Sequence, residues 1–214
     1  TAAPPQSFPP QAADRLGQGR WTFNVASPDG TALEDALGPA RSLVFLRLSA
    51  AQLAKASYSD RTPPRVEYDG DGLASVLAYM ALNDPDGFDR LVDTMRGLIP
   101  HLRRIRFCKT PVRRTEKEYV TFGDDTVERR TKRSYQGDSI LFDFDNADNV
   151  SAHAASEGTL MLLGLLAVLL GPAQPNILLM DDIEHGLHPL AQKSLLDVLN
   201  KIMQTFLFND TATT

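Results

Sequence analysis

The segment from residue 177 to residue 182 most constrains the fold, because it is a short apolar run that ends in two acids. It reads Ile-Leu-Leu-Met-Asp-Asp, and its four apolar residues do not alternate with polar ones. Such a run is typical of a strand that is buried on both faces, as in a parallel sheet. Open α/β sheets bind ligands at the carboxyl ends of their strands. Asp181 and Asp182 therefore mark a candidate site.

The directions of the two acids depend on whether the strand continues. If it does, neighbouring side chains point to opposite faces of the sheet. One carboxylate could then hold a metal-bound water while the other faces a reacting group. A pair of acids after a strand is also common in an ordinary solvated turn, so this segment alone leaves both interpretations open.

The surrounding residues extend the pattern in both directions. Residues 183–189 read Ile-Glu-His-Gly-Leu-His-Pro, and residues 155–160 read Ala-Ser-Glu-Gly-Thr-Leu before a long apolar run. The first string resembles the Walker B segment of ABC-type ATPase heads in the AAA-family ATPases related to RecF, OLD-type nucleases and structural-maintenance-of-chromosomes proteins. The second resembles the signature motif of the same family. Residues 70–77, Gly-Asp-Gly-Leu-Ala-Ser-Val-Leu, resemble a further family segment more weakly.

The resemblance implies a fold and an activity. The fold class is α/β: a partial P-loop NTPase sheet of the ABC-head type, with flanking helices and an antiparallel β insertion. The activity is ATP binding and hydrolysis, with ATP and Mg²⁺ as cofactors, by heads that form a homodimer around nucleotide. Coupling to DNA transactions or to defence is expected. The alternative is a non-hydrolysing, nucleotide-gated scaffold or DNA-binding module.

The Walker B resemblance assigns roles to three acids. Asp181 takes the magnesium role and Asp182 takes the water-activating role. The family usually has Glu where Asp182 stands, and Asp is one methylene shorter. Misplacement by about 1 Å can cost roughly 100-fold in rate. Glu184, on the same face as Asp182 if the chain is extended, is the alternative base.

The signature resemblance assigns roles at the nucleotide itself. Ser156, Glu157 and Gly158 would contact the γ-phosphate of ATP bound by the partner subunit, because a helix N-terminus offers free N–H groups to an anion. Ser156 is also a good N-cap, and the two roles are compatible. His188 is also expected at the nucleotide site, where it would order the turn after the acids. His185 and His188 lack the His-Glu-x-x-His spacing of zinc sites, so no metal is expected there.

No Gly-x-x-x-x-Gly-Lys-Ser/Thr loop occurs in the sequence. This is the loop whose backbone and lysine hold the phosphates in P-loop enzymes. The resemblance therefore predicts that the loop lies upstream of Thr1 or is absent. In the first case the chain would be a fragment that is inactive by itself.

The composition excludes several classes of protein. The 214 residues carry a net charge of −5, with 43% hydrophobic and 23% charged residues, which is ordinary for a globular protein. Cys108 is the single cysteine, so there is no internal disulfide, as in a reducing cytoplasm. The longest apolar run, residues 160–170, is shorter than the roughly 20 residues of a membrane span. A cytoplasmic protein without a membrane partner is expected.

The chain divides into three expected parts: a proline-rich, flexible segment at 1–19, a partial head domain at 20–205, and an aberrant tail at 206–214 that resembles translated sequencing-adapter read-through. Eleven of the 22 basic residues lie between His101 and Arg133, inside a β-rich subregion at 101–150. This subregion reads either as a solvated β-meander or as a basic surface, residues 103–133, for nucleic-acid phosphates.

The expected elements follow from periodicity and turn signals. Strands are expected at 20–25, 43–48, around 104–107 and 119–122 with a turn at 123–125, at 139–144, and at 176–181. Helices are expected from 73, from 84 to about 99, from 156 to 170, and after 189. Residues 52–65 and 145–149 are expected to be loops.

Overall fold

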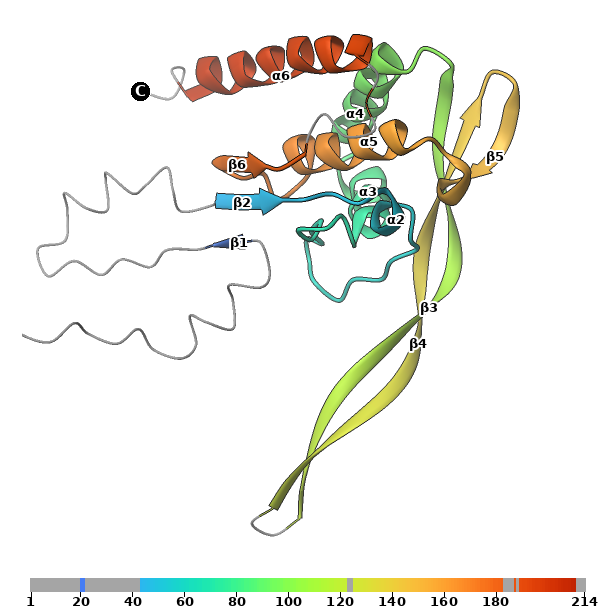
Figure 1. Ribbon diagram of the computed structural model, residues 1–214, viewed down its shortest axis with the longest axis vertical. Helices are drawn as coiled ribbons and strands as arrows, with labels where there is room; N and C mark the ends of the chain where they lie inside the picture. Colours follow the sequence, from blue (N-terminus) through green and yellow to red (C-terminus); the bar gives the residue numbers. More distant parts are fainter. Residues whose placement is uncertain (1–19, 22–42, 123–124, 183–186, 188, 211–214) are drawn as a thin grey trace, which may run out of the picture.

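The structure is a computed structural model of the chain. It describes residues 20–21, 43–122, 125–182, 187 and 189–210. The expected flexible segment 1–19, most of the first expected strand, and residues 211–214 lie outside the described residues. Figure 1 shows two small sheets, a group of helices beside them, and a long hairpin that reaches away from the helices.

The first sheet holds the apolar segment and its neighbours. Its strand order is β1-β2-β6, with β1 antiparallel to β2 and β2 parallel to β6. The bounds are Arg20–Trp21 for β1, Leu43–Leu46 for β2 and Ile177–Met180 for β6. The mixed α/β fold with a parallel pair is therefore confirmed, and β2 and β6 run side by side in the same direction.

Helix starts follow the local sequence signals. Helix α3, Leu73–Asn83, begins after Gly72, whose φ of +88° suits glycine, and a Cβ there would lie 2.5 Å from the carbonyl oxygen of Arg65. Helix α4, Pro85–Leu98, begins after Asp84, whose side chain accepts a hydrogen bond from the Gly87 N–H. Both helices confirm the prediction.

The apolar run after the signature segment forms the centre of the core. Helix α5, Glu157–Leu170, is buried continuously from Thr159 to Val168. It packs against α3, α4 and the short helix α2, Ala50–Leu53, which takes up the start of the expected loop at 52–65. Helix α6, Pro189–Asp210, lies beside α4 (Figure 1). None of the helices in the described ranges has the length and apolar character to cross a membrane.

The basic subregion is an antiparallel sheet, as expected, but one long hairpin takes the place of the predicted short strands. Strand β3, Leu102–Phe122, pairs with β4, Asp125–Phe144, from Phe122↔Asp125 at the tip to Leu102↔Phe144 at the base. The expected separate strand at 139–144 is the end of β4. Pro111 is tolerated because, within the described part of the chain, β3 pairs on one side only.

A third strand corrects the expected loop at 145–149. Strand β5, Ala147–Ser151, pairs with β4 after a tight turn. The turn is stabilised by Asp143, whose Oδ1 accepts the Asn149 N–H at 2.9 Å, while Asn149 adopts a φ of +58°. A short 3₁₀ helix, Ala152–Ala154, then leads into α5.

The expected tail boundary falls inside α6. Residues 206–210 continue this helix, which ends at Asp210. The division into parts at 19 and 205, and the artefactual origin of residues 206–214, stay predictions.

Candidate functional site

The two acids after β6 lie beside the end of β2, because the two strands are parallel and in register. Leu46 pairs with Met180, and the Asp181 N–H donates a 3.0 Å hydrogen bond to the carbonyl oxygen of Leu46. The residue that follows Leu46 is Arg47. The carboxyl ends of both strands thus place one cation next to two carboxylates.

Arg47 contacts both acids. Its Nε lies 3.6 Å from Oδ2 of Asp182 and 4.0 Å from Oδ2 of Asp181. The side chain of Arg47 is 66% exposed, that of Asp182 is 44% exposed, and that of Asp181 is 54% exposed. Exposed pairs of this kind contribute about 0–1 kcal/mol. The contact therefore orients the acids more than it stabilises the fold.

The two acids do not point to opposite faces as a continued strand would require. Strand β6 ends at Met180, and Asp182 adopts a left-handed conformation with φ of +57°. Asp tolerates this region better than most residues. The condition for opposite directions, a strand that continues, is therefore not met, and both carboxylates meet the same guanidinium.

Strand β6 is half buried, not buried on both faces. Leu178 and Met180 pack against the core, whereas Leu179 is 48% exposed. The reason is the position of β6, which in the described residues has a paired strand only on the β2 side. The apolar run alone did not distinguish an edge strand from a central one.

Ser156 is the N-cap of α5, as the sequence predicts. Its Oγ accepts a 3.1 Å hydrogen bond from the Thr159 N–H and lies 2.7 Å from Thr159 Oγ1. Glu157 and Gly158 form the first turn, where backbone N–H groups have no intrahelical partner. This end of α5 is the one remote from the connection to β6, since a 14-residue helix is about 21 Å long.

The structure therefore separates the predicted residues into two groups. Asp181 and Asp182 lie together with Arg47, while Ser156, Glu157 and Gly158 lie together at the start of α5. In the part of the chain that the structure describes, no hydrogen bond or ion pair joins the groups. Glu184 and His188 lie outside the described residues.

Sequence reasoning missed Arg47. The available signal was its position: a single charged residue interrupts the apolar run Leu-Val-Phe-Leu-Arg-Leu at 43–48. Finding its role required knowing that this strand is the parallel neighbour of β6, which no local pattern indicates.

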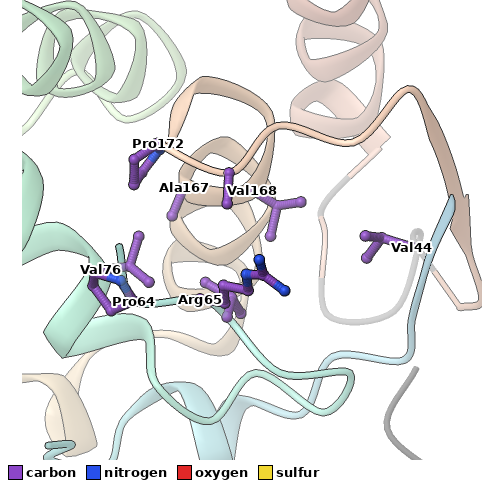
Figure 2. A pocket seen from close by; sticks show the side chains of 9 residues that line it. Val44, Pro64, Arg65, Val76, Ala167, Val168 and Pro172 are labelled. Carbon is purple, nitrogen blue, oxygen red and sulfur yellow. The ribbon is translucent and has the colours of Figure 1, made fainter. Parts of the chain in front are cut away.

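A small pocket lies away from the acids. Figure 2 shows that its walls come from β2, the segment before α3, α3 itself, and the end of α5 with the residues after it. The lining residues are Val44, Pro64, Arg65, Val66, Val76, Ala167, Val168, Pro172 and Ala173. Arg65 is the one charged residue among them, and the lining contains no carboxylate.

The comparison with family models decides the family. The model described as "AAA domain, putative AbiEii toxin, Type IV TA system" matches residues 26–211. The chain belongs to this AAA domain family. Searches of curated proteins and of solved structures found no match.

Membership places this AAA domain among the nucleotide-binding P-loop ATPases, whose chemistry uses a nucleotide and usually Mg²⁺. The acid pair fits such an ion, because Mg²⁺ in phosphate-transfer sites is bound through one or two carboxylates plus the substrate phosphates. Arg47 shows that both carboxylates are directed toward one cationic group. Among the described residues, no group of three or more His, Cys, Asp or Glu side chains could form an all-protein metal cage.

Proposed function

We propose that this AAA domain is part of an ATP-hydrolysing head of the ABC type, which dimerises around nucleotide and is coupled to DNA transactions or defence. The observation that carries the proposal is the grouping of Asp181 and Asp182 with Arg47 at the carboxyl ends of two parallel strands. This is the edge at which α/β sheets bind their ligands. The family match supports ATP as the substrate.

Each acid has a separate role in the proposal. A bound Mg²⁺ would neutralise charge on the phosphates, which phosphoryl transfer needs more than covalent help from the protein. Asp181 would hold that ion through water, and Asp182 would orient the attacking water and accept its proton. Glu184 remains the alternative base.

The start of α5 would serve the nucleotide of a second head. Ser156, Glu157 and Gly158 would present backbone N–H groups and the positive end of the helix to the γ-phosphate. In this arrangement the two groups need no direct contact within one head, and no hydrogen bond or ion pair joins them in the described residues. His188 would order the turn that follows the acids.

The sequence contains no Gly-x-x-x-x-Gly-Lys-Ser/Thr, so hydrolysis would need a phosphate-binding loop supplied in addition to these residues. The proposal is therefore tested on the full-length protein. ATP turnover and ATP binding are measured separately, for the wild type and for two variants of the acids, with Asp60→Asn as a control for removing an exposed carboxylate.

We expect Asp182→Asn to keep ATP binding and to lower turnover by about 100-fold or more, on the scale of a positioned base. Asp181→Asn should weaken Mg²⁺-dependent ATP binding itself, and Asp60→Asn should change neither. Light scattering with the slow Asp182→Asn variant should show an ATP-dependent dimer. A monomer under saturating ATP would contradict the dimer.

A second function has its own support. Asp182 is shorter than the usual Glu and has a left-handed backbone, and both features favour a nucleotide-gated scaffold or DNA-binding module that does not hydrolyse ATP. Wild-type protein that binds ATP with zero turnover, unchanged by Asp182→Asn, would establish this alternative and refute the hydrolase.

A further inference from the structure

We propose that one face of the β3–β4 hairpin binds the phosphate backbone of a nucleic acid. This surface would be where the proposed coupling to DNA takes place, so the inference rests in part on the proposed function. Its evidence is separate, because it comes from the register, exposure and ion pairs of the hairpin and not from the acids near Arg47.

The register assigns each residue of the outer hairpin to one of two faces. Directly opposed residues point to the same side of a two-stranded sheet, and successive residues alternate. Arg113 opposes Ser134, Lys117 opposes Arg130, and one further pair lies between them. We call this side the basic face, and its residues are Arg113, Thr115, Lys117, Arg130, Lys132 and Ser134.

We call the other side of the same segment the paired face. Its residues are Arg114, Glu116, Glu118, Arg129, Thr131 and Arg133. Most of these side chains are half buried, whereas every residue of the basic face is exposed. The two faces therefore differ in exposure before any charge is considered.

Carboxylates offset most of the charge on the paired face. Arg133 forms ion pairs with Glu116 and Glu118, and Thr131 donates a hydrogen bond to Glu118. Arg114 donates a hydrogen bond to the carbonyl oxygen of Tyr58 and stacks over the Tyr58 ring at 5.5 Å. The two glutamates therefore offset two of the three arginine charges on this face.

The basic face lacks this compensation. Lys117 and Arg130 share a single carboxylate, Glu128, at 3.4 Å and 3.1 Å. The side chains of Arg113 and Lys132 make no ion pair or hydrogen bond to any residue that the structure describes. Lys117 and Arg130 also oppose each other directly, and like charges in such positions destabilise a sheet. A bound polyanion would relieve this repulsion.

The spacing and chemistry of the basic face fit phosphates. Same-face residues along a strand lie about 6.8 Å apart, twice the 3.4 Å axial rise between phosphates of one DNA strand. Thr115 and Ser134 add hydroxyl groups, which are common phosphate donors. The six side chains include no apolar residue that could insert into a bilayer, which favours a nucleic acid over a membrane surface.

The hairpin is also shaped and anchored for this contact. Figure 1 shows it extending away from the helices and the other sheet, so a rod-like ligand can lie along it. It is anchored about midway along its length, where Tyr58 stacks on Tyr135 at 4.5 Å between ring centroids. Arg113 and Ser134 form the pair next to Tyr135, and the other residues of the basic face lie closer to the tip of the hairpin.

The test measures fluorescence anisotropy of a labelled 30-base-pair DNA duplex with the full chain, over a series of salt concentrations and without ATP or Mg²⁺. The test variant is Arg113→Gln with Arg130→Gln. The matched control is Arg104→Gln with Arg129→Gln, two exposed arginines on the other side of the hairpin. Circular dichroism and thermal unfolding confirm that all variants fold.

We expect the test variant to weaken binding by tenfold or more at about 0.1 M salt and to reduce the slope of log K against log salt by about 2. The control should stay within about twofold of the wild type. The charge-conserving pair Arg113→Lys with Arg130→Lys should retain most of the affinity. Single-stranded DNA and duplex RNA of equal length identify which backbone is preferred.

Three results would overturn the inference: no binding by the wild type, equal loss in both arginine pairs, or binding to anionic phospholipid vesicles in place of nucleic acid. Because the assay contains no nucleotide, its failure leaves the ATPase proposal standing. An inactive ATPase, in turn, leaves binding by the basic face intact.

Discussion

Nε of Arg47 lies 3.6 Å from Oδ2 of Asp182, so a cation directly after β2 faces the acids that follow β6. The same nitrogen lies 4.0 Å from Oδ2 of Asp181. A group in this position competes with any metal ion for the carboxylates. It also fixes where the carboxylates point before the ion arrives.

We expect Arg47→Gln to bind Mg²⁺ two- to fivefold more tightly, because an exposed ion pair contributes up to about 1 kcal/mol. Calorimetric titration of Mg²⁺ into the full-length protein measures this directly. Arg65→Gln, which removes an exposed arginine beside the pocket, serves as control and should leave the affinity unchanged. Weaker Mg²⁺ binding by Arg47→Gln would show that Arg47 positions the acids more than it competes for them.

Asp182→Glu tests the side-chain length of the proposed base. The added methylene should raise ATP turnover of the full-length protein by up to roughly 100-fold if the shorter side chain is misplaced by about 1 Å. The same change should cost about 1 kcal/mol of stability, because Asp is better tolerated than Glu at φ of +57°. Steady-state phosphate release and thermal unfolding measure the two effects. Unchanged turnover would show that the shorter side chain is not misplaced.

The buried Asp143 predicts an acid-sensitive step in unfolding. A bidentate hydrogen bond from Arg106, at 2.8 Å and 2.7 Å, lowers the pKa of Asp143 to about 2, helped by the Asn149 N–H. In the unfolded chain the pKa of Asp is about 3.9. Between these values the unfolded state binds more protons, so the free energy of unfolding falls as the pH decreases.

The stabilisation from Asp143 is therefore fully present above about pH 4 and is lost as the pH falls through about 2. We expect Asp143→Asn to be less stable than the wild type at pH 7 and to lose less stability between pH 4 and pH 2. Urea denaturation at pH 7, 4 and 2 provides the comparison. Parallel pH dependence in the two proteins would contradict the assignment.

Gly137 allows the close approach of the segment that supports the hairpin. A Cβ at this position would lie 2.5 Å from the carbonyl oxygen of Ser57 and 2.6 Å from Cγ2 of Val112. We expect Gly137→Ala to destabilise the protein by about 1–3 kcal/mol, the usual cost of overpacking. Gly97→Ala is the matched control, because nothing lies within 4 Å of its Cβ position and it lies in α4.

The control should gain about 0.4–1 kcal/mol, since alanine restricts the unfolded chain and favours helix. Thermal unfolding of both variants measures the difference. A Gly137→Ala protein as stable as the wild type would mean that Ser57 can move away from β4 without cost.

Local patterns predicted the helices well because their signals lie within a few residues. The cap at Ser156, the Asp84-Pro85 start and the apolar run of α5 are each visible in a short window. The hairpin was harder, since its length depends on two strands that stay in register over some 20 residues. No short segment of the sequence indicates that pairing.

The candidate site was predictable only in part. The acids were visible because they end an apolar run, but the left-handed turn at Asp182 depends on the backbone conformation that follows the strand. The neighbour of β6 was not predictable either, because about 130 residues separate Arg47 from Asp181 in the chain. Parallel pairing across such a separation produces no periodic pattern in the sequence.

Because the hairpin is anchored at Tyr58 and Tyr135, a small rotation at this point produces a larger displacement of its tip. From Arg114, which stacks over Tyr58, to Phe122 is about 26 Å of extended strand, at roughly 3.3 Å per residue. A tilt of about 10° at the anchor therefore displaces the far end by about 5 Å, given this strand length. Ser57, the neighbour of Tyr58, is hydrogen-bonded to Ser75 of α3 at 2.9 Å, so a small shift of that helix is amplified along the basic face.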